Sequence, residues 1–259
     1  MNTSVMKKVA LGLGMAVMAM SLAGADVSPP PRMDAAVDKM LRDMSASLAG
    51  AKAMTFEVHS MREAVLDSGQ KVEYASNQKV AVRRPDGAMV TVTGDNQDFQ
   101  FVYDGKTATM LNLSLACFGQ TAAPANLDDT MDMLATKYGM VLPLADIVFS
   151  DPYKSLTGQL RSGQDLGVGF VFETKCRHLA FRQEGVDWQI WLEDGTNLPR
   201  KMVITDKETP AQLKYTAYFA KWDLNATLPA ETFLFKPPAN AKRVEFTVPP
   251  ATRPAGAQQ

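Results

Sequence analysis

One short segment, HLAFRQEGVDWQIWLEDG (residues 178–195), holds most of the residue types that could do chemistry. It contains one histidine, one arginine, four carboxylates and two tryptophans. Alternation predicts two strands joined by a turn, with His178, Arg182 and the carboxylates on the same side. That pattern is typical of a solvent-facing ladder of cross-strand charge pairs, and it places Trp188 and Ile190 on the opposite, apolar face.

Cys176 and His178 share a strand face, and such a pair could supply two ligands of a metal site. No second cluster of ligands is evident in the sequence, so we expect no metal and no other cofactor. A Gly-x-Ser-x-Gly elbow is missing from the sequence as well. A hydrolase site could still assemble from distant segments or around Cys176 as a nucleophile. A hydrolase is therefore the less favoured alternative, and we expect a protein that is not an enzyme.

The first 25 residues have the pattern of an export signal. Lys7 and Lys8 precede an apolar run that ends in the small residues Ala23-Gly24-Ala25. We therefore expect a signal peptide over residues 1–25, cleavage after Ala25 and a periplasmic location. The residue directly after the expected cleavage site is Asp26 rather than a cysteine that could carry a lipid, so we expect no permanent membrane anchor.

The charged residues and the cysteines bear on possible partners. The 27 basic and 28 acidic residues nearly balance and form no basic run, so nucleic acid is excluded as an expected partner. Cys117 and Cys176 are the two cysteines. An oxidising compartment would allow a disulfide between them, and two unpaired thiols are the alternative.

Helical spacing recurs in two parts of the chain. Apolar residues spaced three and four apart predict a helix over residues 34–49, with Asp34 at its start and Gly50 at its end. A second pattern begins at Asn126 and ends at Gly139, and short helical turns are expected over 143–153. These segments predict an N-terminal helix and a helical insert in the middle of the chain.

The remaining segments alternate with a period of two and are separated by turns about every ten residues, which predicts antiparallel meanders. Asp104-Gly105 is a two-residue hairpin signal, and Lys236–Asn240 separates two expected short strands near the end. The predicted fold is mainly β with helices (α+β). We expect a curved antiparallel half-barrel of about 11 strands, closed by the N-terminal helix and the mid-chain helical insert. The expected domain limits are an extended lead-in over 26–33, one half-barrel domain over 34–247 and a disordered tail over 248–259.

The segment 178–195, followed by LPRKMVITDK (198–207), resembles a family of predicted periplasmic proteins known only as a domain of unknown function. The resemblance covers nearly the whole mature chain. Further matching pieces occur in the same order along the chain as in the family: AVRRPD (81–86), YDGKT (103–107), YGMVLPLADIVFSDPY (138–153) and FKPPANAK (235–242). The resemblance assigns no catalytic residue. It implies a fold similar to the lipoprotein carrier superfamily, which includes the periplasmic lipoprotein chaperone, the outer-membrane lipoprotein receptor and a sensor of envelope stress.

The resemblance also implies acyl chains held between the sheet and the helices. We expect a lid of Leu41, Met44, Met131 and Leu134, and a sheet wall of Phe56, Val90, Phe101, Phe181, Trp188, Ile190 and Tyr215. The expected function is non-catalytic binding of a lipid or an acylated protein, as a carrier or sensor of the cell envelope. The alternative is an interaction or scaffold module, in which the same residues fill a core and an envelope protein is the partner. The oligomeric state stays open.

Overall fold

The computed structural model describes residues 32–140 and 143–246, and its strands form one sheet of 13 strands. The predicted signal peptide, most of the lead-in and the tail lie outside the described residues. The strand order is β1-β8-β9-β10-β11-β12-β2-β3-β4-β5-β6-β7-β13. Eleven of the strands are long, and they are β2 (Ala53–Val65), β3 (Lys71–Arg83), β4 (Gly87–Gly94), β5 (Asp98–Tyr103), β6 (Thr107–Asn112), β7 (Cys117–Ala122), β8 (Leu160–Val171), β9 (Thr174–Gln183), β10 (Val186–Glu193), β11 (Pro199–Asp206) and β12 (Lys214–Asp223).

The eleven long strands pair antiparallel throughout, as predicted. β12 pairs with β2, which joins the two meanders into one sheet. The two remaining strands have two residues each. β1 (Arg32–Met33), which was not predicted, pairs parallel with β8, and β13 (Lys242–Arg243), which follows the Lys236–Asn240 segment, pairs parallel with β7. They are the two edges of the sheet, so the sheet is curved without closing into a barrel.

Four α-helices lie within the described residues. α1 (Ala35–Gly50) precedes β2, and α2 (Leu127–Tyr138), α3 (Ala145–Val148) and α4 (Pro152–Thr157) connect β7 to β8. The predicted ends of α2 are confirmed. The Asn126 side chain accepts a hydrogen bond from the N–H of Asp129 at 2.8 Å, and Gly139 ends the helix in the left-handed conformation, with φ of 64°. Asp34 stands at the start of α1, but its side chain makes no capping hydrogen bond.

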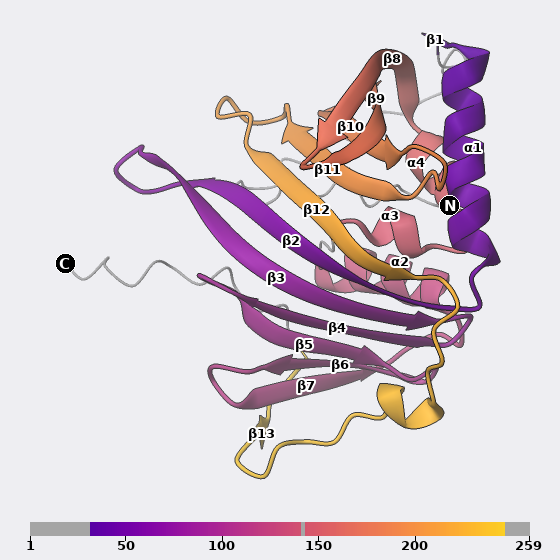
Figure 1. Cartoon of the computed structure of the whole chain (residues 1–259). Coiled ribbons are helices and arrows are strands. Elements are labelled where there is room, and N and C mark those ends of the chain that lie inside the picture. Colours follow the sequence, from indigo (N-terminus) through magenta and orange to yellow (C-terminus); the bar gives the residue numbers. More distant parts are fainter. Residues whose placement is uncertain (1–31, 141–142, 247–259) are drawn as a thin grey trace, which may run out of the picture.

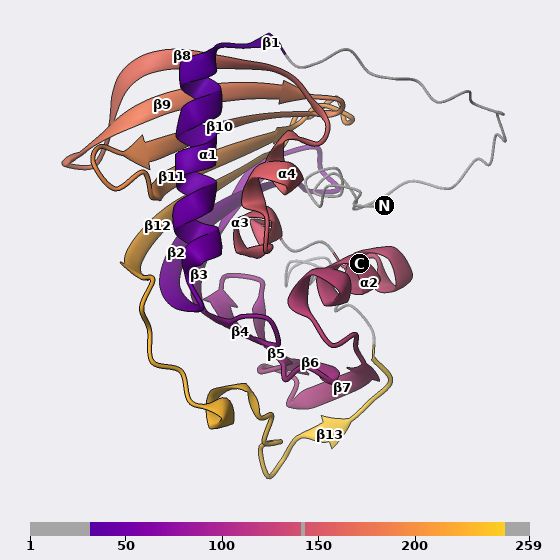
Figure 2. The ribbon, with the colours of Figure 1, turned by 90° about the vertical axis from the view of Figure 1, so that its right-hand side faces the viewer.

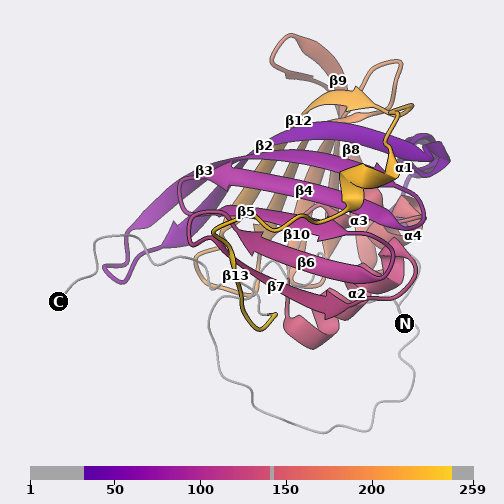
Figure 3. The ribbon, with the colours of Figure 1, turned by 90° about the horizontal axis from the view of Figure 1, so that it is seen from below.

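The helices lie on the inner side of the curved sheet. Figure 1 shows α1 along one end of the strands, with α2, α3 and α4 behind them. In Figure 2 the sheet bends from β8–β12 around to β4–β7, and α1, α3 and α4 lie within the bend. Seen from below, β12 and β2 to β7 run side by side on the outer surface (Figure 3). The predicted half-barrel closed by helices is therefore confirmed.

Alternation along the strands explains why the inner face is apolar. On β10, Trp188 and Ile190 are buried, whereas Gln189 and Trp191 between and beside them are partly exposed. β12 repeats this pattern with Tyr215, Ala217 and Phe219 on the buried face. Because the apolar face would otherwise contact water, it requires a helical cover.

The Asp104-Gly105 hairpin differs from the sequence prediction. β5 and β6 are joined by three residues, 104–106, rather than two. Asp104 Oδ1 accepts hydrogen bonds from the backbone N–H groups of Lys106 and Thr107, at 3.0 and 2.8 Å. This aspartate turn stabilises the longer loop.

The prediction of two short strands around Lys236–Asn240 is half wrong. The segment before it contains the 3-10 helix η2 (Ala230–Phe233), and only β13 follows it. Pro229 precedes η2 directly. Proline has no backbone N–H to donate and its φ is fixed, so the chain enters a helical turn there instead of a strand.

Candidate functional site

The histidine-containing segment that opened the sequence analysis forms the β9–β10 hairpin, as predicted. Its polar side chains lie on the face away from the helices. His178 Nε2 lies 2.9 Å from Gln189 Oε1, and the imidazole stacks on Trp191 with ring centroids 3.9 Å apart. Arg182 Nε donates to Asp187 Oδ1 at 3.3 Å across the same pair of strands. This face is therefore a ladder of cross-strand pairs rather than a reactive cluster.

The environment of Cys176 and His178 does not favour nucleophilic chemistry. Burial raises the pKa of the Cys176 thiol, so the thiolate that would react is disfavoured. Burial also lowers the pKa of His178, whose Nε2 is already engaged by Gln189. Within residues 32–140 and 143–246, no group of three or more His, Cys, Asp or Glu side chains could hold a metal ion.

The disulfide between Cys117 and Cys176 does not form, and both thiols are free. Cys117 is the first residue of β7, and Cys176 lies on β9. These strands are near opposite ends of the strand order, and Figure 2 shows them on opposite arms of the bend. A disulfide requires Cα atoms within about 7 Å of each other, which this placement does not provide.

The seven side chains predicted for the sheet wall all lie in one apolar cluster on the inner face. Phe181 and Trp188 stack with centroids 4.0 Å apart, and Phe56 packs against Phe219 at 6.1 Å. Val90 is the exception in burial, because it is only partly buried against the cluster. The others are buried: Phe56, Phe101, Phe181, Trp188, Ile190 and Tyr215.

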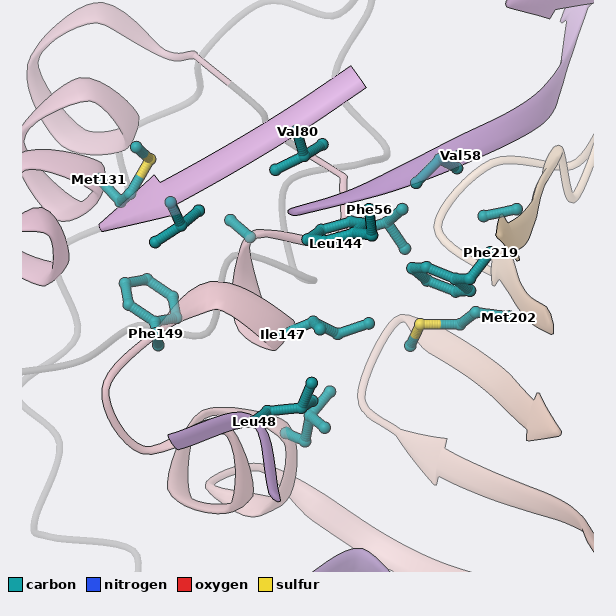
Figure 4. Close-up of a cluster of buried hydrophobic side chains, with 14 of the residues drawn as sticks. Leu48, Phe56, Val58, Val80, Met131, Leu144, Ile147, Phe149, Met202 and Phe219 are labelled. Atoms are coloured by element: carbon teal, nitrogen blue, oxygen red, sulfur yellow. The ribbon is translucent and has the colours of Figure 1, made fainter. Parts of the chain in front are cut away.

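The four side chains predicted for the lid lie in the same cluster. Leu41 and Met44 come from α1, and Met131 and Leu134 come from α2. Sequence reasoning missed a further contribution from the α3 segment. Figure 4 shows Leu144 and Ile147 pointing toward Phe56 and Phe219 of the sheet. The apolar letters of residues 144–149 were the available signal, but four helical residues are too few to show a period.

Hydrogen bonds connect α4 to α1, and sequence reasoning missed these contacts as well. The hydroxyl of Tyr153 on α4 donates to Asp38 Oδ1, and Arg42 Nη2 donates to that hydroxyl at 2.7 Å. The backbone N–H of Tyr153 donates to Ser45 Oγ at 2.9 Å. The hydrogen bond from Arg42 holds the pKa of Asp38 below its usual value, whereas burial raises the pKa of Tyr153. The lid thus has a polar fastening on its outer side and apolar contacts on its inner side.

The Trp188 indole and the Tyr215 hydroxyl are polar groups within the apolar cluster. Tyr215 accepts a hydrogen bond from Gln78 Nε2 at 3.0 Å, and burial raises its pKa. The Trp188 Nε1 is buried with no hydrogen-bond partner among the residues that the structure describes.

None of the described helices is long and apolar enough to cross a bilayer.

The fold and the apolar cluster place the chain in the class of half-barrel proteins, in which a curved antiparallel sheet holds apolar side chains beneath helices. Within this class, the chain belongs to the family described as predicted periplasmic protein (DUF2092), whose model matches residues 37–247. The family resemblance found in the sequence is therefore confirmed. A search of curated proteins gives no match.

Solved structures with a similar arrangement are distant in sequence. An uncharacterised conserved protein from Thermus thermophilus is 10% identical with a TM-score of 0.50, over 82% of this chain and 99% of that chain. A LolA superfamily protein from Nitrosomonas europaea is 12% identical with a TM-score of 0.37, over 77% and 97% of the two chains. The lipoprotein LppX from Mycobacterium tuberculosis is 10% identical with a TM-score of 0.43, over 76% and 99%. The likeness to the Thermus protein shows a shared fold and assigns no activity.

Proposed function

We propose that this protein is a non-catalytic binding protein of the periplasm, which holds the acyl chain of a lipid or of an acylated protein between its sheet and its helices. One observation carries the proposal: all eleven side chains expected from the sequence to meet the ligand gather in a single apolar cluster. Each methylene group removed from water contributes about 0.8 kcal/mol. A chain of a dozen methylenes therefore contributes on the order of 10 kcal/mol before entropy costs, without specific polar contacts.

The ligand must take the place of contacts that the protein makes with itself, because the cluster is buried. We propose that the helices separate from the sheet and that the acyl chain enters between them. Methionine side chains suit this exchange, since the flexible thioether adapts to gaps of irregular shape. Six buried methionines belong to the cluster, on both of its sides: Met44, Met54, Met110, Met131, Met140 and Met202.

The proposal includes a cellular location and a domain organisation. The family is described as predicted periplasmic. We propose that residues 1–25 direct export and are removed after Ala25, and that residues 34–247 act as one domain between the lead-in over 26–33 and the tail over 248–259. In this scheme, the protein carries or senses acylated molecules of the envelope.

A second candidate function is an interaction module with a filled core and no ligand. The observation that favours it is the extent of burial, since Leu41, Met44 and Leu134 are all 0% exposed. Such a module would bind an envelope protein on its outer surface and would not open. The two candidates differ in one property, which is whether an apolar molecule enters the cluster.

Mass spectrometry separates the two candidates. The protein is purified from its native periplasm without detergent, measured under native conditions and then extracted with organic solvent. Binding predicts a stoichiometric lipid or acylated peptide in the native complex and in the extract. Ligand-free protein that also takes up no fluorescent fatty acid would contradict the binding function. A pull-down of envelope proteins would then be the next experiment.

A further inference from the structure

Arg84 lies where three helical segments meet one end of the sheet. It follows β3, and its backbone N–H donates to the Lys52 carbonyl after α1 at 2.8 Å. The carbonyl of the next residue, Pro85, accepts from the N–H of Leu127 at the start of α2, also at 2.8 Å. The Arg84 guanidinium reaches the end of α3, where Nη1 donates to the Val148 carbonyl at 2.6 Å.

The other two guanidinium nitrogens of Arg84, Nε and Nη2, are buried and have no hydrogen-bond partner in the part of the chain that the structure describes. Burial lowers the pKa of Arg84, and the nearby charge of Asp128 opposes this only in part. The Asp128 carboxylate itself accepts hydrogen bonds from the N–H and the hydroxyl of Ser150. An arginine stays charged even when its guanidinium nitrogens are buried, so leaving Nε and Nη2 unpaired costs free energy that an anion would recover.

Nε and Nη2 form one edge of the guanidinium and point in the same direction. Elsewhere in this chain the same edge holds a carboxylate. Arg200 Nε and Nη2 donate to the two oxygens of Glu193 at 3.1 and 3.0 Å, and Arg177 uses the same two nitrogens for Asp165. This fork matches the spacing of two oxygens in a carboxylate or a phosphate. In Arg84 this fork has no partner among residues 32–140 and 143–246, while Nη1 on the other edge donates to the Val148 carbonyl.

The surroundings of Arg84 place this fork at the border of the apolar cluster. Val148, which Nη1 contacts, packs against the cluster. Its neighbours on both sides, Ile147 and Phe149, are buried members of it, and so is Leu127 at the start of α2. An anion at the fork would thus lie beside the apolar side chains that line the proposed acyl site.

We propose that the Nε and Nη2 edge of Arg84 binds the anionic head group of the acyl ligand, a carboxylate or a phosphate, while the chain lies in the cluster. This inference rests on the proposed function and adds the ligand class, which is an anionic amphiphile. The head group and the chain are recognised by different forces: a charge-assisted fork for the first, and apolar burial for the second.

The test compares ligands that differ only in the head group. Dodecanoic acid, dodecyl phosphate and dodecan-1-ol compete with a neutral fluorescent apolar probe for the full chain at neutral pH. The wild type is expected to bind at least one of the two anions about tenfold more tightly than the alcohol, and Arg84→Gln is expected to remove that preference while leaving affinity for the alcohol unchanged. The preference between carboxylate and phosphate identifies the source of the anion.

Two further variants make the test specific. Arg84→Lys keeps the charge and a donor but lacks the fork, so it should lose most of the preference even if Arg84→Gln does not fold. Arg161→Gln removes an exposed arginine that is paired with Glu184 at 3.4 Å, and it should leave the preference intact. Circular dichroism confirms the fold of each variant.

The outcomes separate this inference from the proposed function. Equal affinity of the wild type for the acids and the alcohol, or a preference that survives in both Arg84 variants, would overturn the role of Arg84 and leave the acyl site standing. No binding of any of the three ligands would overturn the acyl site and the role of Arg84 with it.

Discussion

Trp188 on β10 stacks on Phe181 of β9 toward the helices, with ring centroids 4.0 Å apart and ring planes inclined by 21°. Trp191 on the same strand stacks on His178 toward the outside, with centroids 3.9 Å apart. One hairpin thus carries an aromatic stack on each face, and only the inner stack belongs to the apolar cluster. The two tryptophans form a matched pair for comparing the inner face of the sheet with the outer one.

Truncating the inner stack should cost far more stability than truncating the outer one. Trp188 is 1% exposed, so Trp188→Ala should lower the free energy of unfolding by about 3–5 kcal/mol through lost burial and a new cavity. Trp191→Ala should cost about 1 kcal/mol, the range of an aromatic pair that is partly in water. Urea denaturation of both variants measures the difference. Similar losses for the two would contradict the assignment of the faces.

Weakening the fastening between α1 and α4 should make the helical cover easier to open. Tyr153→Phe removes the hydroxyl that bonds Asp38 and Arg42, and should lower the free energy of unfolding by about 1 kcal/mol. If the acyl chain enters by separation of the helices, the same variant should also take up a fluorescent fatty acid faster, as measured by stopped flow. Tyr218→Phe, on the outer face of β12, is the control and should change neither quantity. An unchanged uptake rate in Tyr153→Phe would argue against entry beside α4.

The stability of the protein should depend on pH through His178. Burial lowers the pKa of His178, although the hydrogen bond with Gln189 opposes the shift. The unfolded chain, with a histidine pKa of about 6.5, therefore takes up a proton before the folded one does. The free energy of unfolding should decrease as the pH falls from about 6.5 to the lower pKa of the folded state. Below that pKa the contribution of His178 should no longer change with pH. Urea denaturation from about pH 8 to pH 5 should show a smaller decrease in His178→Gln than in the wild type or in His59→Gln. An identical pH dependence in all three proteins would rule out this contribution of His178.

The two cysteines should behave as free thiols of different reactivity. Cys117 is partly exposed, whereas Cys176 is buried and its thiol pKa is raised by burial. Iodoacetamide should therefore label Cys117 first in the native protein, and Cys176 only after unfolding. Peptide mass mapping without reductant measures the order of labelling. A peptide pair linked through Cys117 and Cys176 would contradict the free thiols.

The strand layout and the sheet wall could be predicted because alternation along a strand is a local signal. Trp188 and Ile190, for example, must face the same side whatever the rest of the chain does. The ends of α2 were predictable for the same reason, since Asn126 and Gly139 act on their own neighbours. The curvature and the helical cover were expected from the size of the sheet and its apolar face, and the family resemblance implied the same fold.

The features that sequence reasoning missed depend on contacts between distant segments. Tyr153 bonds Asp38 across 115 positions of sequence, and Arg84 reaches Val148 across 64. Neither pair has a local pattern that reveals it. The sequence left the choice between a disulfide and two free thiols open, because the number of cysteines carries no information on where β7 and β9 lie in the sheet.

The most direct test of the central claim asks which face an acyl chain touches. Two variants each keep a single tryptophan. One carries Trp191→Phe and Trp222→Phe and keeps Trp188, and the other carries Trp188→Phe and Trp222→Phe and keeps Trp191. A fatty acid brominated along its chain quenches tryptophan fluorescence on contact. An acyl site between sheet and helices predicts saturable quenching of Trp188 and none of Trp191. Equal quenching of both, or quenching of Trp191 alone, would contradict it.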